Sequence, residues 1–324
     1  MAVYTELTDQ ELRKFVNHFA LGDLVRAHGI AAGTINTIYD LTTTQGHYIL
    51  RILEGRTRAE AQFEERLVEH LVAKGLRVPR MMPGRRGGAI LSIGPRQQVS
   101  ILEFVEGREL AVFEVEVSHA RQAGAFLGQL SQATKTFKTT KDNRFSESAL
   151  KDMLDQCLSG FEASEHRADL EILSTELEMK VSFDGLPVGM THGDLFVDNA
   201  RFKQGNLEAV IDFEMASTMP YIYDIAVAIG DWAFSQNVFH PERARALIEG
   251  YQDYRVLEPN ELGRLFGMLR FTACRYAISR FFDFELNAQP DVERLYKDYR
   301  HFMARLRALD ALGEPDFVAA VMGV

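Results

Sequence analysis

A polar segment enclosed by two apolar ones restricts the fold of this chain more than any other feature. The stretch VGMTHGDLFVDNARF begins at Val188 and reads as a loop between two short buried strands. A further apolar run, LEAVID, ends at Asp212, thirteen residues after Asn199. Polar groups beside buried strands are costly unless they have partners or a purpose. The loop therefore predicts a chemical site, built around His192, Asp194, Asp198 and Asn199.

These residue types favour metal-assisted phosphoryl transfer. Asn199 and Asp212 offer the hard oxygen atoms that Mg²⁺ prefers, and magnesium takes its other ligands from phosphates and water. Asp194 is then free to orient or deprotonate a substrate hydroxyl. One aspartate near a strand end is usually a turn or cap residue. The complete set, His-Gly-Asp-x4-Asn followed by a strand and Asp-Phe, is much rarer by chance.

The remaining pattern predicts an α+β chain with two lobes. A capping box of Thr8 and Glu11 opens a helix over 8–19, and β-branched runs within 25–53 predict an antiparallel meander. A helix over 58–75 and strands over 88–93 and 97–105 complete a small antiparallel β lobe with one helix, residues 1–103. A connector near 103–107 leads to a mainly helical lobe, residues 104–324. Its expected elements are helices over 116–134, 146–161, 165–182, 222–236, 241–254, 259–286 and 291–309, and strands over 188–191, 200–202 and 207–212.

Composition excludes several classes of protein. The chain has 36 Lys and Arg against 46 Asp and Glu, a net charge of −10, which argues against nucleic acid as a partner. Asp224 and Asp231 interrupt the apolar run near 221–234, and no signal peptide is visible, so no membrane association is expected. Two isolated cysteines, Cys157 and Cys274, favour a reducing compartment. We expect a cytoplasmic protein whose partner is a small molecule; the oligomeric state stays open.

The segments HGDLFVDN and VIDFE resemble the catalytic loop and metal-binding segment of the aminoglycoside-phosphotransferase-like kinases, which share the protein-kinase-like fold. The resemblance implies that Asp194 is the catalytic base and that His192 organises the loop. It implies that Asn199 and Asp212 bind Mg²⁺. Asp224 matches a later aspartate of the family that braces the catalytic loop, although a simple helix N-cap is an equally good interpretation.

The same resemblance implies an ATP-binding clamp in the first lobe. The strand YILRIL places Arg51 where protein kinases carry a basic residue for the α- and β-phosphates. Arginine can make bidentate contacts with phosphate. Its partner on the following helix is expected to be Glu64 or, less favourably, Glu65.

Two further segments would complete the clamp. Gly33 and Thr34, in the hairpin loop AAGTINT, would cover the phosphates of ATP. The connector EFVEG would pass the adenine, with backbone hydrogen bonds from Glu103 and Val105.

Several segments resemble the homoserine kinases built on this fold, and the likeness covers nearly the whole chain. They include GIAAGTINTIYDLTT, HLVAKGLRVP, RALIEGYQDYRVLEPNELGRL and TACRYAISRFFDF. The resemblance implies ATP-dependent phosphorylation of the side-chain hydroxyl of L-homoserine, a step of threonine biosynthesis. A zwitterionic acceptor needs a cation for its carboxylate and an anion for its ammonium group. Asp231 is a candidate for the ammonium, and Arg275 or Arg280 for the carboxylate; structural ion pairs between helices are the alternative.

Two other functions remain open. The same chemistry would serve a choline or ethanolamine kinase or an aminoglycoside phosphotransferase, and an aromatic cage would favour a quaternary ammonium acceptor. A non-catalytic relative that only binds nucleotide is less favoured, because every catalytic position of the second lobe is filled.

Overall fold

The computed structural model describes residues 5–30, 36–179, 181–288 and 296–323. The chain divides into two compact units. The N-terminal unit contains Met1–Glu106, and the C-terminal unit consists of Gly107–Ala288 and Lys297–Val324. The division at Glu106 falls inside the connector expected at 103–107. The separate roles of the two lobes stay predictions.

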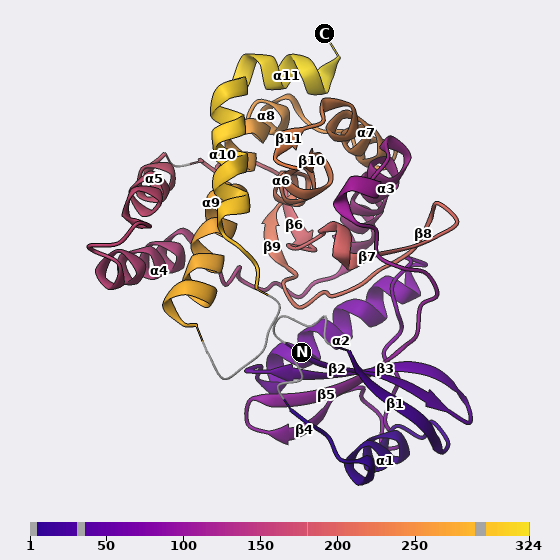
Figure 1. Ribbon diagram of the computed structural model, residues 1–324. Helices are drawn as coiled ribbons and strands as arrows, with labels where there is room; N and C mark the ends of the chain where they lie inside the picture. Colours follow the sequence, from indigo (N-terminus) through magenta and orange to yellow (C-terminus); the bar gives the residue numbers. More distant parts are fainter. Residues whose placement is uncertain (1–4, 31–35, 180, 289–295, 324) are drawn as a thin grey trace. The chain divides into compact units, whose positions relative to one another are not determined.

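A five-stranded antiparallel sheet forms the centre of the N-terminal unit (Figure 1). Its strands are β1 (Leu24–Ile30), β2 (Thr37–Thr43), β3 (Gly46–Glu54), β4 (Leu91–Gly94) and β5 (Gln97–Glu103), in the order β1-β2-β3-β5-β4. Burial alternates along β2 with the period of two that a strand imposes. The central strand β3 is instead buried over four consecutive residues, 50–53, which indicates that both of its faces are covered.

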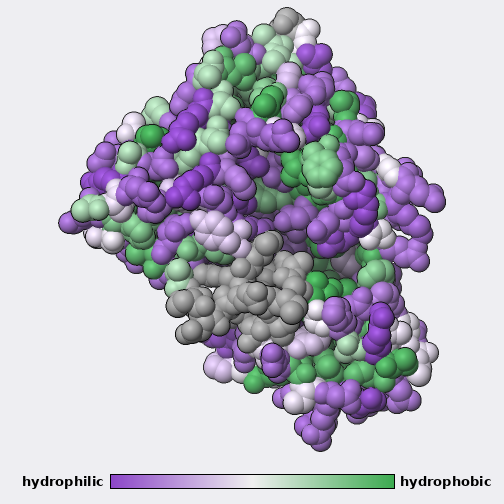
Figure 2. All heavy atoms as spheres, viewed as in Figure 1, coloured by the Kyte–Doolittle hydropathy of each residue, from purple (hydrophilic) through white to green (hydrophobic). Residues whose placement is uncertain are grey.

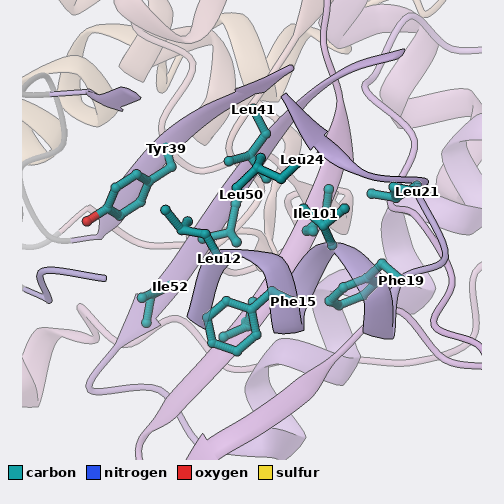
Figure 3. Packing of buried hydrophobic residues seen from close by; sticks show 12 residues of the cluster. Leu12, Phe15, Phe19, Leu21, Leu24, Tyr39, Leu41, Leu50, Ile52 and Ile101 are labelled. Atoms are coloured by element: carbon teal, nitrogen blue, oxygen red, sulfur yellow. The ribbon is translucent and has the colours of Figure 1, made fainter. Parts of the chain in front are cut away.

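Two helices accompany this sheet, α1 (Asp9–His18) and α2 (Arg58–Ala73), which confirms the helices expected over 8–19 and 58–75. The capping box of Thr8 and Glu11 is present at the start of α1. Figure 3 shows how α1 packs: Phe15 and Phe19 lie with Leu50 and Ile101 of the sheet in one hydrophobic cluster. Burial of such side chains contributes about 2 kcal/mol each. The cluster therefore fixes β3, the strand that carries Arg51.

The C-terminal unit is mainly helical, and α6 (Tyr221–Trp232) is its most buried helix, with every residue from Ile222 to Trp232 buried. The other helices are α3 (Val117–Ala133), α4 (Glu147–Gly160), α5 (Arg167–Glu178), α7 (Pro241–Gln252), α8 (Pro259–Leu262), α9 (Leu265–Phe281), α10 (Arg300–Leu312) and α11 (Glu314–Met322). Three strand pairs complete it: β6 (Val188–Thr191) with β9 (Ser217–Pro220), β7 (Ala200–Lys203) with β8 (Asn206–Val210), and β10 (Phe234–Ser235) with β11 (Val238–Phe239).

Several predicted boundaries in this unit were wrong. The helix expected over 222–236 ends at Trp232, because Gln236 and Asn237 take positive φ angles of 49° and 64° and form the turn of the β10–β11 hairpin. The helix expected over 259–286 is divided into α8, α9 and a π-helical turn, Phe282–Leu286. Strand β9 and helix α11 were not predicted. The first residues of the helix expected over 291–309 lie outside the described residues. Within them, α10 begins at Arg300.

Helices α3 and α7 lie side by side in close contact (Figure 1). A Cβ atom on Gly250 would lie 2.0 Å from the carbonyl oxygen of Arg121, and one on Gly124 would lie 1.9 Å from that of Leu247. Because Gly124 and Gly250 have no side chain, the backbones of α3 and α7 can approach each other.

None of the helices in the described ranges has the length and apolar character needed to cross a membrane. Cys157 and Cys274 are both buried free thiols.

Candidate active site

Asp224 braces the predicted catalytic loop from helix α6. Its Oδ2 accepts the backbone N–H of His192 and its Oδ1 that of Gly193, both at 2.8 Å. The helix begins at Tyr221, so Asp224 is not its N-cap. Burial raises the pKa of Asp224 to about 7, against the opposing effect of the two amide bonds, and the nearby charge of Asp194 adds to the rise. The geometry is that of a brace.

His192 is fully buried and connects two segments of the site. Its Nδ1 accepts the N–H of Asp194 at 3.2 Å, so Nε2 carries the proton and donates to the carbonyl of Ile211 at 3.1 Å. Burial lowers the pKa of the imidazole to about 4, which keeps the ring neutral. The bond to Ile211 fixes the backbone directly before Asp212. His192 therefore organises the loop, and both of its ring nitrogens are occupied by the protein.

Asn199 is oriented by Asp194. Its Nδ2 donates to the backbone carbonyl of Asp194 at 2.8 Å and lies 3.4 Å from Asp194 Oδ2. The amide nitrogen is thus fixed, which leaves Oδ1 as the atom for a metal ion. The backbone carbonyl of Asn199 accepts the N–H of Ile211 at 2.9 Å. Asp212 follows with φ of 66°, a conformation uncommon for residues other than glycine and frequent at functional sites.

These residues fit a magnesium ion. Asn199 Oδ1 and the Asp212 carboxylate are hard oxygen ligands, held together by the bonds of Ile211 to Asn199 and His192. Within the described ranges, no three His, Cys, Asp or Glu side chains are grouped as a metal site. One amide and one carboxylate suit a cation that keeps waters and binds substrate phosphates.

Tyr276, on α9, contacts the carboxylate of Asp194, the predicted base, and was not itself predicted. Its hydroxyl donates to Asp194 Oδ1 at 2.6 Å and also lies 3.0 Å from the carbonyl oxygen of Gly193. The ring is buried and stacks on Phe302 with centroids 5.0 Å apart. Burial raises the pKa of Asp194, while the charges of Arg275 and Lys297 and the Tyr276 hydrogen bond act in the opposite direction.

Arg275 is also buried, with 2% of its surface exposed. Its guanidinium carbon lies 3.8 Å from the centre of the Phe145 ring and 3.7 Å from that of Tyr276. Arg280 lies 4.5 Å from the ring centre of Phe302 and donates to the carbonyl of Asp298 at 3.3 Å. Burial lowers the pKa of Arg280 to about 10. Both predicted carboxylate-binding candidates therefore lie in the C-terminal unit beside aromatic rings.

The carboxylate of Asp231 binds other groups of the protein. Its Oδ2 accepts the N–H of Val197 at 2.9 Å, and its Oδ1 pairs with Arg305 at 3.0 Å. Asp231 thus supports the far end of the catalytic loop. This geometry does not favour its predicted contact with a substrate ammonium group, since both carboxylate oxygens already have partners.

In the N-terminal unit, Arg51 and Glu64 form a buried ion pair at 2.7 Å. Glu65 instead accepts the backbone N–H of Ala89. The partner of Arg51 is therefore Glu64, the first of the two predicted candidates.

The remaining predicted contacts of ATP are described only in part. Gly33 and Thr34 lie outside the described residues. The backbone N–H of Glu103 donates to the carbonyl of Arg80 at 2.9 Å, and its carboxylate accepts the N–H of Arg80, also at 2.9 Å. The backbone N–H and the carboxylate of Glu103 therefore both have partners within the N-terminal unit. Val105 follows two residues later and is half-buried.

The catalytic loop and the fold define a phosphotransferase of the protein-kinase-like class. A solved amicoumacin kinase, in complex with AMP-PNP and Ca²⁺, shares the fold with a TM-score of 0.68 at 18% identity, over 94% of this chain and 93% of that one. A model of the phosphotransferase enzyme family matches residues 26–259. The chain belongs to the phosphotransferase enzyme family.

Curated relatives are similar along almost the full length. A homoserine kinase of Methylobacterium radiotolerans is 35% identical over 314 residues, which cover 94% of this chain and 95% of that protein. A homoserine kinase of Methylorubrum populi is 34% identical with the same coverage.

Proposed function

We propose that this protein is a homoserine kinase, which transfers the γ-phosphoryl group of ATP to the side-chain hydroxyl of L-homoserine with Mg²⁺ as cofactor. The assignment of L-homoserine as the acceptor rests on the similarity to curated homoserine kinases over 94% of the chain. The chemistry is supported by the half-buried Asp194 carboxylate, which lies beside Asn199, one of the two proposed metal ligands. A role in threonine biosynthesis and a cytoplasmic location follow from this proposal and stay predictions.

In the proposed reaction Asp194 is the catalytic base. The substrate hydroxyl oxygen attacks the γ-phosphorus, its proton passes to an oxygen of Asp194, and ADP leaves with the electrons of the broken P–O bond. Asp224 and His192 hold the loop in place, so that little reorganisation is needed during the reaction. Asn199 and Asp212 would hold Mg²⁺, which when bound neutralises phosphate charge.

We propose that Arg51 binds the α- and β-phosphates of ATP, with Glu64 fixing its orientation. The buried 2.7 Å pair supports this, because protein kinases use a strand cation and a helix glutamate in the same way. Gly33, Thr34 and the backbone of Glu103 and Val105 remain our candidates for the other nucleotide contacts, on the family resemblance alone.

Two arginines near Asp194 disfavour the cationic acceptors that the sequence left open. The charges of Arg275 and Arg280 both act on Asp194. Choline or a polycationic aminoglycoside would meet like charge there, whereas homoserine brings a carboxylate.

An acceptor panel tests the proposal. Release of ADP is measured with L-homoserine, L-serine, choline, ethanolamine and an aminoglycoside, each with Mg²⁺ and ATP. Homoserine is expected to give the highest kcat/KM. If another alcohol is phosphorylated and homoserine is not, the assignment of homoserine as the acceptor is refuted.

Asp194→Asn tests the base. Loss of a general base should lower kcat about 1000-fold, with Mg-ATP affinity nearly unchanged. Asp198→Asn is a matched control in the same loop, because the Asp198 side chain is half exposed and pairs with Lys297 at the surface. A loss of ATP binding in Asp194→Asn would show that Asp194 is a metal ligand instead.

A further inference from the structure

Arg275 carries a buried charge with no direct ionic partner. Among the described residues it forms no hydrogen bond or ion pair, and its Nε is buried without an acceptor. Hydrophilic residues cover much of the helical unit in Figure 2, whereas Arg275 lies in its interior with 2% of its surface exposed. A fully buried arginine that only faces rings is an exception that calls for an explanation.

The free-energy cost of burying a charge makes the position of Arg275 unusual. Desolvating an isolated charge is strongly unfavourable, and buried arginines normally have carboxylate partners. The C-terminal unit follows this rule at Arg255, which pairs with the buried Glu261 at 2.9 Å, and at Arg305, which pairs with Asp231 at 3.0 Å. Contacts with the faces of Phe145 and Tyr276 recover only a part of the cost. Within the described ranges, the charges of Asp194 and Asp283 act on Arg275, but no carboxylate forms a hydrogen bond or ion pair with its guanidinium group.

Tyr276 contacts both the Arg275 guanidinium and the proposed base, Asp194. Its ring is stacked against the Arg275 guanidinium, and its hydroxyl is bonded to Asp194 Oδ1. The anion-receiving group and the catalytic base thus contact the same side chain.

Arg280 is a weaker candidate than Arg275. It donates to the carbonyl of Asp298 at 3.3 Å, so part of its hydrogen-bonding capacity is already used. This difference favours Arg275 as the group that binds an anion.

We infer that Arg275 binds the α-carboxylate of the acceptor and thereby selects hydroxy amino acids over amino alcohols that lack a carboxylate. The inference rests on the proposed function, since it assigns the specificity of the same site. Phe145 and Tyr276 hold the planar guanidinium on both faces, which leaves its edge for the paired hydrogen bonds that a carboxylate makes.

The test compares two acceptors and two variants. L-Homoserine and 3-aminopropan-1-ol share the amine and the hydroxyl, and only the first has a carboxylate. In the wild type, kcat/KM for homoserine should exceed that for 3-aminopropan-1-ol by about 100-fold. Arg275→Met keeps a side chain between the two rings and removes the charge. Because the Arg275 charge also lowers the pKa of Asp194, the two acceptors are compared above the acid limb of the pH profile. There Arg275→Met should lower kcat/KM for homoserine by about 100-fold, mostly through KM, and leave that for 3-aminopropan-1-ol within about threefold.

Arg280→Met is the matched control and should keep the preference for homoserine. If Arg275→Met does not fold, Arg275→Lys replaces it; a lysine keeps the charge but loses the paired hydrogen bonds, so KM for homoserine should rise while that for the amino alcohol stays the same. Equal losses on both acceptors, or an unchanged preference, would overturn the inference. A wild type that does not phosphorylate homoserine at all would instead refute the proposed function.

Discussion

Replacing Tyr276 by Phe removes a single hydroxyl from the candidate site and tests whether that group positions the catalytic base. Phenylalanine keeps the ring that stacks on Phe302 and lies against Arg275. What is lost is the 2.6 Å hydrogen bond to Asp194. A hydrogen bond to a charged group contributes about 2 kcal/mol, which corresponds to roughly a 30-fold decrease in kcat if it is needed in the transition state.

The pH profile gives a second readout. The Tyr276 hydrogen bond acts against the burial that raises the pKa of Asp194. Without the hydroxyl, the pKa of Asp194 should rise further, and the base must be ionised to accept a proton. The acid limb of the kcat/KM profile should therefore move to higher pH in Tyr276→Phe, with KM for the acceptor nearly unchanged.

Tyr223→Phe is the matched control. Tyr223 is equally buried and near Asp194, but its hydroxyl interacts with Asn143. The assay is steady-state ADP release between about pH 5 and 9, at saturating ATP. An equal decrease in kcat in both variants, or a Tyr276→Phe profile that keeps its acid limb, would refute the role of the hydroxyl.

Three further predictions concern stability and ATP binding. Glu64→Gln should lower the free energy of unfolding by about 3 kcal/mol in denaturant titrations and raise KM for ATP, because it removes the carboxylate charge that is paired with the buried Arg51. The pKa of His192 in the folded protein, about 4, lies below its unfolded value, so the neutral ring contributes about 3 kcal/mol to the free energy of unfolding above pH 6.5. This contribution is lost as the pH falls toward 4. In His192→Asn the free energy of unfolding should therefore decrease less over that pH range. Gly250→Ala should destabilise the fold by about 2 kcal/mol, because the new methyl group overlaps a backbone carbonyl, whereas Gly230→Ala, whose nearest contact is 3.6 Å away, should be neutral or stabilising in thermal melts.

The parts of the site that could be predicted are those whose residues are close in sequence or follow a family pattern. Asp194 and Asn199 are five residues apart in one loop, so local geometry alone brings them together. The pair of Arg51 and Glu64 was predicted because the strand and the next helix are adjacent in the chain, and the structure contains it. The antiparallel meander expected over 25–53 is confirmed in β1, β2 and β3, whereas the position of β5 between β3 and β4 was not predicted.

Tyr276 could not be predicted, for a physical reason. Helix α9 is buried on nearly all sides, so its sequence has no polar face from which an orientation could be read. Tyr276 also meets Asp194 across 82 residues of sequence. Arg275 could be named as a candidate from its charge alone. Both arginines lie beside rings, and what distinguishes them is that Arg280 donates to Asp298 whereas Arg275 forms no hydrogen bond within the described ranges.

Asp231 shows how a correct geometric argument led to the wrong partner. Asp224 and Asp231 are seven residues apart on α6, two helical turns, and so lie on the same face. The sequence interpretation placed a substrate on that face. The structure places the catalytic loop there: Asp224 accepts the amides at its start, and Asp231 accepts that of Val197 near its end. Trp232 donates to the carbonyl of Leu195 between them. One buried helix thus holds the loop at three points, and the acidic residues that seemed available to a ligand are the ones that keep the base in position.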